Sequence, residues 1–237
     1  MTAILNTRPR EQAAELSGLL RAAALEPIEL PAIEIVAAWA PGEQHRVERA
    51  IRAGAYDWLI LQSQNAARAV LPLPPHRASV VCGTSTARSL GIEASIALDH
   101  FSASAALDAL RPLLRQGQRV LLPRAAAGRE ELLDALRALN IQVDAPVCYR
   151  TQPVSPESLA ALPQLGLAAV TICSPSAVRS LVNAVGLPTL QTQRIVCLGG
   201  TTARAARELG LPVHAVAART SMASLVEAVL STLEVTV

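Results

Sequence analysis

The 237-residue chain contains no lysine, so all 21 of its basic residues are arginines. This absence excludes Schiff-base catalysis and the lysine of a Walker-type phosphate loop. Aromatic residues make up only 2% of the sequence, which argues against a nucleic-acid surface built on stacked rings. The net charge of +2 also lacks the basic excess of a protein that follows the phosphate backbone of nucleic acid. With 51% hydrophobic residues, the chain can build cores, and its length suits two domains.

Motifs for a metal or a nucleotide cofactor are also missing. The four cysteines have no Cys-x-x-Cys spacing and lie in or beside apolar runs, so we interpret them as small core residues. No histidine pairs by spacing with Cys, Asp or Glu, and no Gly-x-Gly-x-x-Gly follows a strand-like run. We therefore expect neither metal nor cofactor. The start lacks a secretory signal, so we expect a cytoplasmic protein. We also expect a monomer that binds neither nucleic acid nor membrane.

An internal repeat organises the chain. Residues 4–31 return as residues 120–147, at an offset of 116 positions (120 minus 4), and both copies predict strand, polar turn, amphipathic helix and second strand. Residues 59–91 return as residues 170–210, and both copies predict short buried strands followed by turns and helices. This alternation is typical of an α/β fold with doubly wound, mostly parallel sheets.

The order of the repeated blocks permits two arrangements. In a tandem arrangement, two domains follow one another and share one linker. In a crossed arrangement, the chain leaves the first domain, builds the whole second domain and returns, which requires two linkers. Polar or proline-containing stretches at residues 38–43 and 150–156 are candidate linkers. The repeat alone leaves both arrangements open.

Four turns that follow strand-like runs have the composition of anion-binding sites. Glycine lets the backbone approach an anion, hydroxyl groups cap the next helix, and helix N-termini direct N–H groups outward. Helix capping alone is the alternative for each turn, but the occurrence of turns at corresponding places of the repeat favours anion binding. The candidate residues in these turns are Ser63, Gly83, Thr84, Thr86, Ser174, Pro175, Ser176, Gly199, Thr201 and Thr202.

Three arginines and one tyrosine complete the candidate site. Arg8 and Arg124 occupy matching turns at strand ends, and Arg129 follows Gly128 at the start of a predicted helix. Each charge-assisted hydrogen bond from arginine contributes about 1.5–3 kcal/mol, so these side chains would strengthen the binding of carboxylates or phosphates. Tyr149 closes an apolar run next to the second candidate linker, where its phenol could donate a hydrogen bond to a ligand or simply pack.

Seven short motifs run in order along nearly the whole chain. They are TRP at 7–9, YDWLILQSQNA at 56–66, GTSTA at 83–87, R-x-x-x-G-R-x-x-L at 124–132, VCYRT at 147–151, CSPSAV at 173–178 and GGTTA at 199–203. Together these motifs resemble those of the uroporphyrinogen-III synthase family. The resemblance implies the crossed arrangement, with two similar α/β lobes joined by two extended linkers. It places the boundaries as lobe 1 at 1–36 and 153–237, lobe 2 at 41–148, and linkers at 37–40 and 149–152.

The resemblance also implies a lyase of tetrapyrrole and heme biosynthesis. Such an enzyme cyclises hydroxymethylbilane, a linear tetrapyrrole with acetate and propionate arms, to uroporphyrinogen III with loss of water and inversion of the last pyrrole ring. It implies that Tyr149 assists the loss of the hydroxyl group, that Thr86 and Thr202 are the functional threonines, and that Ser174 and Pro175 form the family's Ser-Pro turn. The alternative is a non-catalytic two-lobe binding or regulatory domain for a small polyacidic metabolite.

Overall fold

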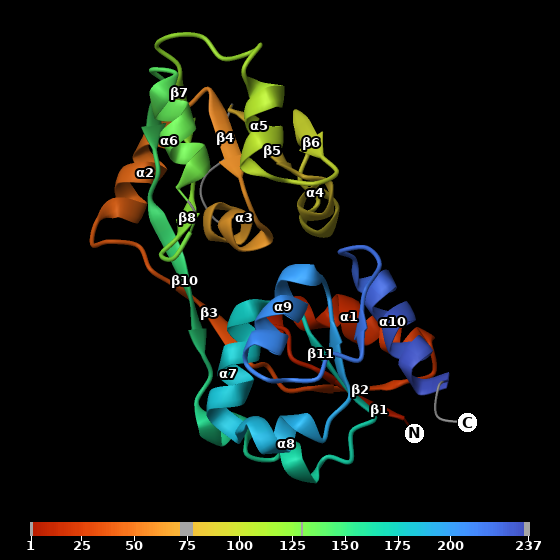
Figure 1. Cartoon of the computed structure of the whole chain (residues 1–237). Helices are drawn as coiled ribbons and strands as arrows, with labels where there is room; N and C mark the ends of the chain where they lie inside the picture. The colour runs from red at the N-terminus through yellow and green to blue at the C-terminus, as the bar shows by residue number, and fades with distance from the viewer. Residues whose placement is uncertain (1, 72–77, 129, 235–237) are drawn as a thin grey trace. The chain divides into compact units, whose positions relative to one another are not determined.

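The computed structural model describes residues 2–71, 78–128 and 130–234. The chain divides into two units (Figure 1): unit 1 consists of Met1–Glu34 and Thr151–Val237, and unit 2 of Ile35–Arg150. Unit 1 therefore combines both ends of the chain and is discontinuous in sequence.

Unit 1 is built on a five-stranded sheet in which every pairing is parallel. Its order is β13-β12-β11-β1-β2. The strands are β1 (Ala3–Asn6), β2 (Glu26–Glu29), β11 (Ala169–Ile172), β12 (Ile195–Cys197) and β13 (Ala215–Val216). In the central strand β1, Ile4 and Leu5 are both fully buried but belong to opposite cores, because successive side chains of a strand point to opposite faces. Helices must therefore cover both faces of this sheet.

One face of this sheet is covered by α1 (Arg10–Ala22) and α10 (Met222–Glu234), which pack against each other (Figure 1). In α1 the buried positions Ala13, Leu16 and Leu20 recur at helical spacing and form one apolar stripe. The opposite face is covered by α7 (Pro175–Val185), α8 (Leu187–Gln191), α9 (Gly200–Glu208) and the short 3₁₀ helices η1 (Pro156–Leu159) and η2 (Leu162–Gln164).

Unit 2 repeats this design with a second fully parallel sheet, in the order β6-β5-β4-β7-β9. Its strands are β4 (Trp58–Leu61), β5 (Ser79–Gly83), β6 (Ile96–Leu98), β7 (Arg119–Leu121) and β9 (Gln142–Asp144). One face packs against α5 (Ala103–Leu110) and α6 (Glu131–Ala138). The other face packs against α2 (Glu43–Arg52), α3 (Gln64–Val70) and α4 (Thr84–Leu90).

A third, three-stranded sheet contains the two segments in which the chain passes from one unit to the other. Its order is β3-β10-β8. The strands are β3 (Ile33–Ala37), β10 (Val147–Pro153) and β8 (Arg124–Ala125). Both β3 and β10 contain residues of unit 1 and of unit 2. In unit 2, β10 pairs in parallel with β8, and Tyr149 is the partner of Ala125.

The sheet topology confirms the predicted fold class and the crossed arrangement. β1 pairs with β11 in unit 1, whereas β4 pairs with β7 in unit 2, so each sheet combines one copy of each repeated block. In unit 1 the strand order reverses between β1 and β11, and in unit 2 it reverses between β7 and β4. Ligands of doubly wound sheets bind at the carboxyl ends of the strands where the order reverses. A ligand site is therefore expected at these two places.

Candidate active site

The hydroxyl groups of Tyr149 and Ser63 meet in unit 2, where β4 ends. Ser63 Oγ accepts a hydrogen bond from the Ala66 N–H at 3.1 Å and caps α3. The same Oγ lies 3.0 Å from the Tyr149 hydroxyl, and either oxygen can be the donor. Tyr149, which lies in β10, is only 9% exposed. The structure thus joins two of the residues singled out in the sequence.

The environment of Tyr149 keeps its phenol protonated. Burial raises the pKa of Tyr149 above its ordinary value by more than the hydrogen bond with Ser63 lowers it. A neutral phenol can donate its proton, as a general acid must. Burial likewise raises the pKa of the neighbouring Cys148 to about 12, so this cysteine is a neutral thiol and a poor nucleophile.

Arg124 lies on β8, the strand beside Tyr149. Its Nη1 is 2.8 Å from Glu130 Oε1, and its side chain is 17% exposed. The Arg124 Nε is buried and has no hydrogen-bond partner among the described residues. In the same turn, Gly128 N donates to the Ala125 carbonyl at 3.2 Å, and a Cβ on Gly128 would also lie 3.2 Å from that oxygen, which favours glycine. Arg129 lies outside the described residues.

The last residue of β5 and the first turn of α4 contain the other three predicted residues of unit 2. Gly83 precedes the first residue of α4 and makes no side-chain cap. Thr84 Oγ1 donates to Asp99 Oδ1 at 3.2 Å on the surface. Thr86 is 6% exposed and lies inside the unit. Of these two threonines, Thr84 is therefore the one whose hydroxyl is hydrogen-bonded to an acidic side chain.

In unit 1, two threonines join β1 and β11 where the strand order reverses. Thr7 Oγ1 donates to the Thr171 carbonyl at 2.7 Å, and Thr171 Oγ1 donates to the Leu5 carbonyl at 2.7 Å. Thr7 is 1% exposed and Thr171 is fully buried. These reciprocal hydrogen bonds fix the ends of the two strands and the direction in which the chain leaves β1.

Arg8, the next residue, is buried without a carboxylate partner. Its Nε donates to the Gln12 carbonyl at 2.9 Å, and Nη1 contacts Met222 Sδ of α10 at 2.9 Å. Among the described residues, the ion pairs all involve other arginines. Burial raises the pKa of the nearby Cys173 thiol by more than the Arg8 charge lowers it, so Cys173 stays neutral. Among the described residues, therefore, no carboxylate pairs with the positive charge of Arg8.

The Ser-Pro turn begins α7 in unit 1. Ser174 Oγ accepts from the Ala177 N–H at 3.2 Å and is the N-cap, and Pro175 is the first residue of the helix, a position where its missing N–H costs little. Ser174 Oγ also lies 3.0 Å from Ser176 Oγ. The turn therefore matches the Ser63 turn of unit 2, where a serine also caps the helix.

The glycine-rich turn between β12 and α9 is the last of the predicted turns. Gly199 precedes the helix in extended conformation and provides no side-chain cap. Thr202 is 4% exposed, whereas Thr201 is exposed. Both threonines lie in the first turn of α9, and buried Thr202 corresponds to buried Thr86 of unit 2.

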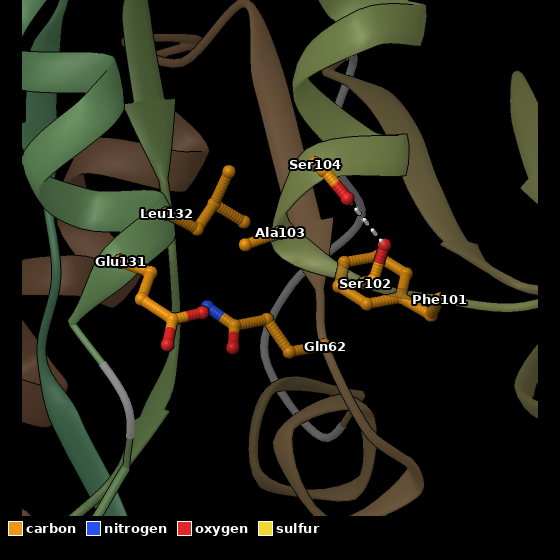
Figure 2. Close-up of a pocket in the computed structure, with 7 residues that line it drawn as sticks. All are labelled: Gln62, Phe101, Ser102, Ala103, Ser104, Glu131 and Leu132. Carbon is orange, nitrogen blue, oxygen red and sulfur yellow. Dashed lines mark hydrogen bonds between the residues drawn. The ribbon is translucent and has the colours of Figure 1, made fainter.

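Unit 2 has a pocket at the carboxyl ends of its strands (Figure 2), which was not predicted from the sequence. Its volume is about 370 Å³. The lining residues are Gln62, Phe101, Ser102, Ala103, Ser104, Glu131 and Leu132. They come from the end of β4 and the starts of α5 and α6. Ser102 Oγ caps α5 by accepting from the Ala105 N–H at 3.1 Å, and a serine before an apolar helical run is the one signal that could have indicated it.

Within the described parts of the chain, no three His, Cys, Asp or Glu side chains are grouped so that they could hold a metal ion. No helix in residues 2–71, 78–128 or 130–234 is long and apolar enough to span a bilayer.

Comparison with known proteins gives a consistent family. A family model described as uroporphyrinogen-III synthase HemD matches residues 14–227. The porphyrin biosynthesis protein HemD of Ruminiclostridium josui is 25% identical over 245 residues, covering 97% of this chain and 48% of that protein. The chain therefore spans about half the length of this relative. The uroporphyrinogen-III synthase of Synechococcus elongatus is 33% identical over 196 residues, covering 75% of this chain and 72% of that protein.

A solved structure has the same fold. The crystal structure of uroporphyrinogen-III synthetase from Helicobacter pylori matches with a TM-score of 0.63 and 17% sequence identity, and the match covers 98% of this chain and 99% of that chain. At this identity the similarity establishes the fold alone.

Proposed function

Because the chain belongs to the uroporphyrinogen-III synthase family, we propose that it cyclises hydroxymethylbilane to uroporphyrinogen III, with loss of water and inversion of the last pyrrole ring. The observation that carries this proposal is the protonated phenol of Tyr149, hydrogen-bonded to the helix cap Ser63 where the strand order of unit 2 reverses. This arrangement supplies an oriented proton donor.

Tyr149 is the catalytic acid in this proposal. Ser63 Oγ accepts from the Ala66 N–H, so its own proton is free to be donated to Tyr149 Oη. The phenol proton is then available to the substrate. As the carbon–oxygen bond of the terminal hydroxymethyl group breaks, this proton leaves with the hydroxyl group as water. The remaining electron deficiency forms a cationic azafulvene, and the proton released on ring closure restores the phenol.

The substrate's carboxylates are bound by the capped turns and by arginines. Ser174, Pro175 and Ser176 begin α7, and the helix dipole contributes about 0.3–1 kcal/mol at such a place, so one turn alone binds weakly. Arginine hydrogen bonds contribute about 1.5–3 kcal/mol each. Among the described residues, the buried Arg8 has no carboxylate partner, and Arg124, whose Nη1 pairs with Glu130, has no hydrogen-bond partner for its buried Nε. These two side chains are therefore the strongest candidates.

The remaining predicted positions belong to the same proposal with smaller roles. Backbone and hydroxyl groups of the two Gly-Thr turns contribute further donors to the substrate. These positions are Gly83, Thr84, Thr86, Gly128, Arg129, Gly199, Thr201 and Thr202. The proposal also includes a cytoplasmic monomer that works without a cofactor, and linkers at residues 37–40 and 149–152. Gel filtration coupled to light scattering tests the monomer, since a particle of twice the 24.9 kDa chain mass would contradict it.

The reaction is tested by the isomer that forms. Hydroxymethylbilane closes without a catalyst to uroporphyrinogen I, so purified protein and a protein-free control are incubated with it side by side, and the products are oxidised and separated. We expect type III product in the protein sample alone. Type I product in both samples would contradict the cyclase and would leave a non-catalytic binding domain.

A further inference from the structure

The pocket of unit 2 carries a charge that does not suit a polyanionic ligand. Glu131, the first residue of α6, lines it, and Figure 2 shows the Glu131 carboxylate and the Gln62 amide pointing toward one another. A carboxylate here repels acetate and propionate arms but attracts N–H donors and cations. We infer that this pocket binds a single pyrrole ring through its N–H, and that Glu131 stabilises the positive charge that develops on that ring. The inference rests on the proposed cyclase function for the identity of the ring.

The size of the pocket limits what it can hold. Its volume of about 370 Å³ lies near the lower end of the roughly 300–1,000 Å³ that enclose a drug-sized ligand. A linear tetrapyrrole with its arms is far larger than such a ligand, whereas one substituted pyrrole ring is smaller. The pocket therefore suits one ring, with the rest of the substrate outside it.

The residues that line the pocket suit both parts of a pyrrole, its apolar ring surface and its polar N–H. Phe101 and Leu132 supply apolar surface for the flat ring. Gln62 and Glu131 supply oxygen acceptors for the ring N–H. The ring N–H is a donor only, so it pairs with a carboxylate without leaving a proton unsatisfied.

The pocket is connected to the proposed acid through two successive residues of the chain. Gln62, which lines it, directly precedes Ser63, whose hydroxyl is hydrogen-bonded to Tyr149. In this inference a ring held there adjoins the turn at which water leaves, and the cation forms in that step. Glu131 forms no covalent bond in the reaction. Its hydrogen bond to the ring N–H is present in the bound substrate and strengthens when the positive charge appears, so its charge lowers the barrier more than it tightens substrate binding.

Glu131→Gln keeps the size and one acceptor oxygen of the side chain but removes its charge. Asp134→Asn is the matched control, because Asp134 is exposed on the same helix and does not line the pocket. In the cyclase reaction we expect kcat of Glu131→Gln to fall about tenfold with KM unchanged or lower, and Asp134→Asn to behave as wild type. A tenfold change is modest for catalysis because Glu131 is exposed to solvent, which screens its charge.

A second measurement tests the pocket without turnover. The probes are 2-(aminomethyl)pyrrole, a cation at neutral pH, and pyrrole-2-carboxylate, an anion of similar shape, titrated into ¹⁵N-labelled protein. We expect the cation to shift the backbone amide signals of Phe101 and Leu132, and Glu131→Gln to weaken its binding about fivefold. Absence of these shifts, equal binding of the anion, or unchanged binding to Glu131→Gln would overturn the inference.

The two measurements separate the pocket from the proposed reaction. Charge-dependent binding of the cationic pyrrole by a protein that forms no type III product would support the pocket and contradict the cyclase. Type III product from wild type, with normal kcat in Glu131→Gln, would support the cyclase and overturn the role of Glu131.

Discussion

Replacing Tyr149 by Phe separates the chemical role of its hydroxyl from its role in packing. The ring still fills its buried place, and the variant loses one hydrogen bond, to Ser63 at 3.0 Å. Ser63 Oγ keeps its bond from the Ala66 N–H, so no buried polar group is left without a partner. We therefore expect the free energy of unfolding to fall by only about 1 kcal/mol.

The expected kinetic effect is much larger. A general acid contributes about 10²- to 10⁴-fold to the rate, which corresponds to roughly 3–5 kcal/mol of activation free energy. Turnover of hydroxymethylbilane and urea unfolding are measured on the same preparations. Tyr56→Phe is the matched control, because it also removes a tyrosine hydroxyl bond, to Asp144 at 2.5 Å, in unit 2. It should lose stability and keep its kcat.

The reasoning is refuted if Tyr149→Phe keeps kcat within about twofold of wild type while losing the stability of one hydrogen bond. Such a result would leave Tyr149 as a packing residue with a polar tip. Equal kinetic losses in both tyrosine variants would also contradict it, since they would point to a general effect on unit 2.

Three further predictions concern the groups that hold each unit together. Burial raises the pKa of Asp144, but the hydrogen bonds from Arg46 and Tyr56 outweigh burial and lower this pKa below its ordinary 3.8. The ionised Asp144 therefore contributes fully to the free energy of unfolding above about pH 4, and this contribution is lost as the pH falls further. Asp144→Asn should therefore lower the free energy of unfolding by about 1 kcal/mol at pH 7, with a smaller difference from wild type below pH 4 in urea titrations; a difference independent of pH would contradict the pKa shift. Thr171→Val removes the donor to the Leu5 carbonyl and should cost about 1–2 kcal/mol by thermal unfolding, and an unchanged midpoint would show that the bond contributes nothing. Ser174→Ala removes the cap of α7 and should cost about 0.5–2 kcal/mol, while an additional rise of KM would support substrate contact at this turn and an unchanged KM would favour capping alone.

The sequence predicted those features that depend on short-range patterns. The offset of 116 residues correctly made β1 and β7 equivalent, because a duplicated strand–turn–helix unit keeps its spacing. The serines before α3 and α7 were recognised as possible caps for the same local reason, and both cap their helices. The choice between crossed and tandem arrangements depends instead on which distant strands pair. Local patterns carry no information about this pairing.

Long-range contacts account for what the sequence did not predict. Arg8 contacts Met222, more than two hundred residues away, which no spacing rule reveals. The pocket brings Gln62, Phe101 and Glu131 together from three elements that meet only when the sheet is formed. The hydrogen bond between Ser63 and Tyr149 likewise depends on β10 lying beside β8, and not on any motif that contains both residues.

The central claim, that this chain directs ring closure of a linear tetrapyrrole, is tested most directly by the ratio of type III to type I uroporphyrinogen over a series of protein concentrations. Spontaneous closure competes with the catalysed route, so the account predicts a ratio that rises in proportion to active protein and is abolished by boiling the sample. A ratio that stays at the protein-free value at every concentration would contradict the claim.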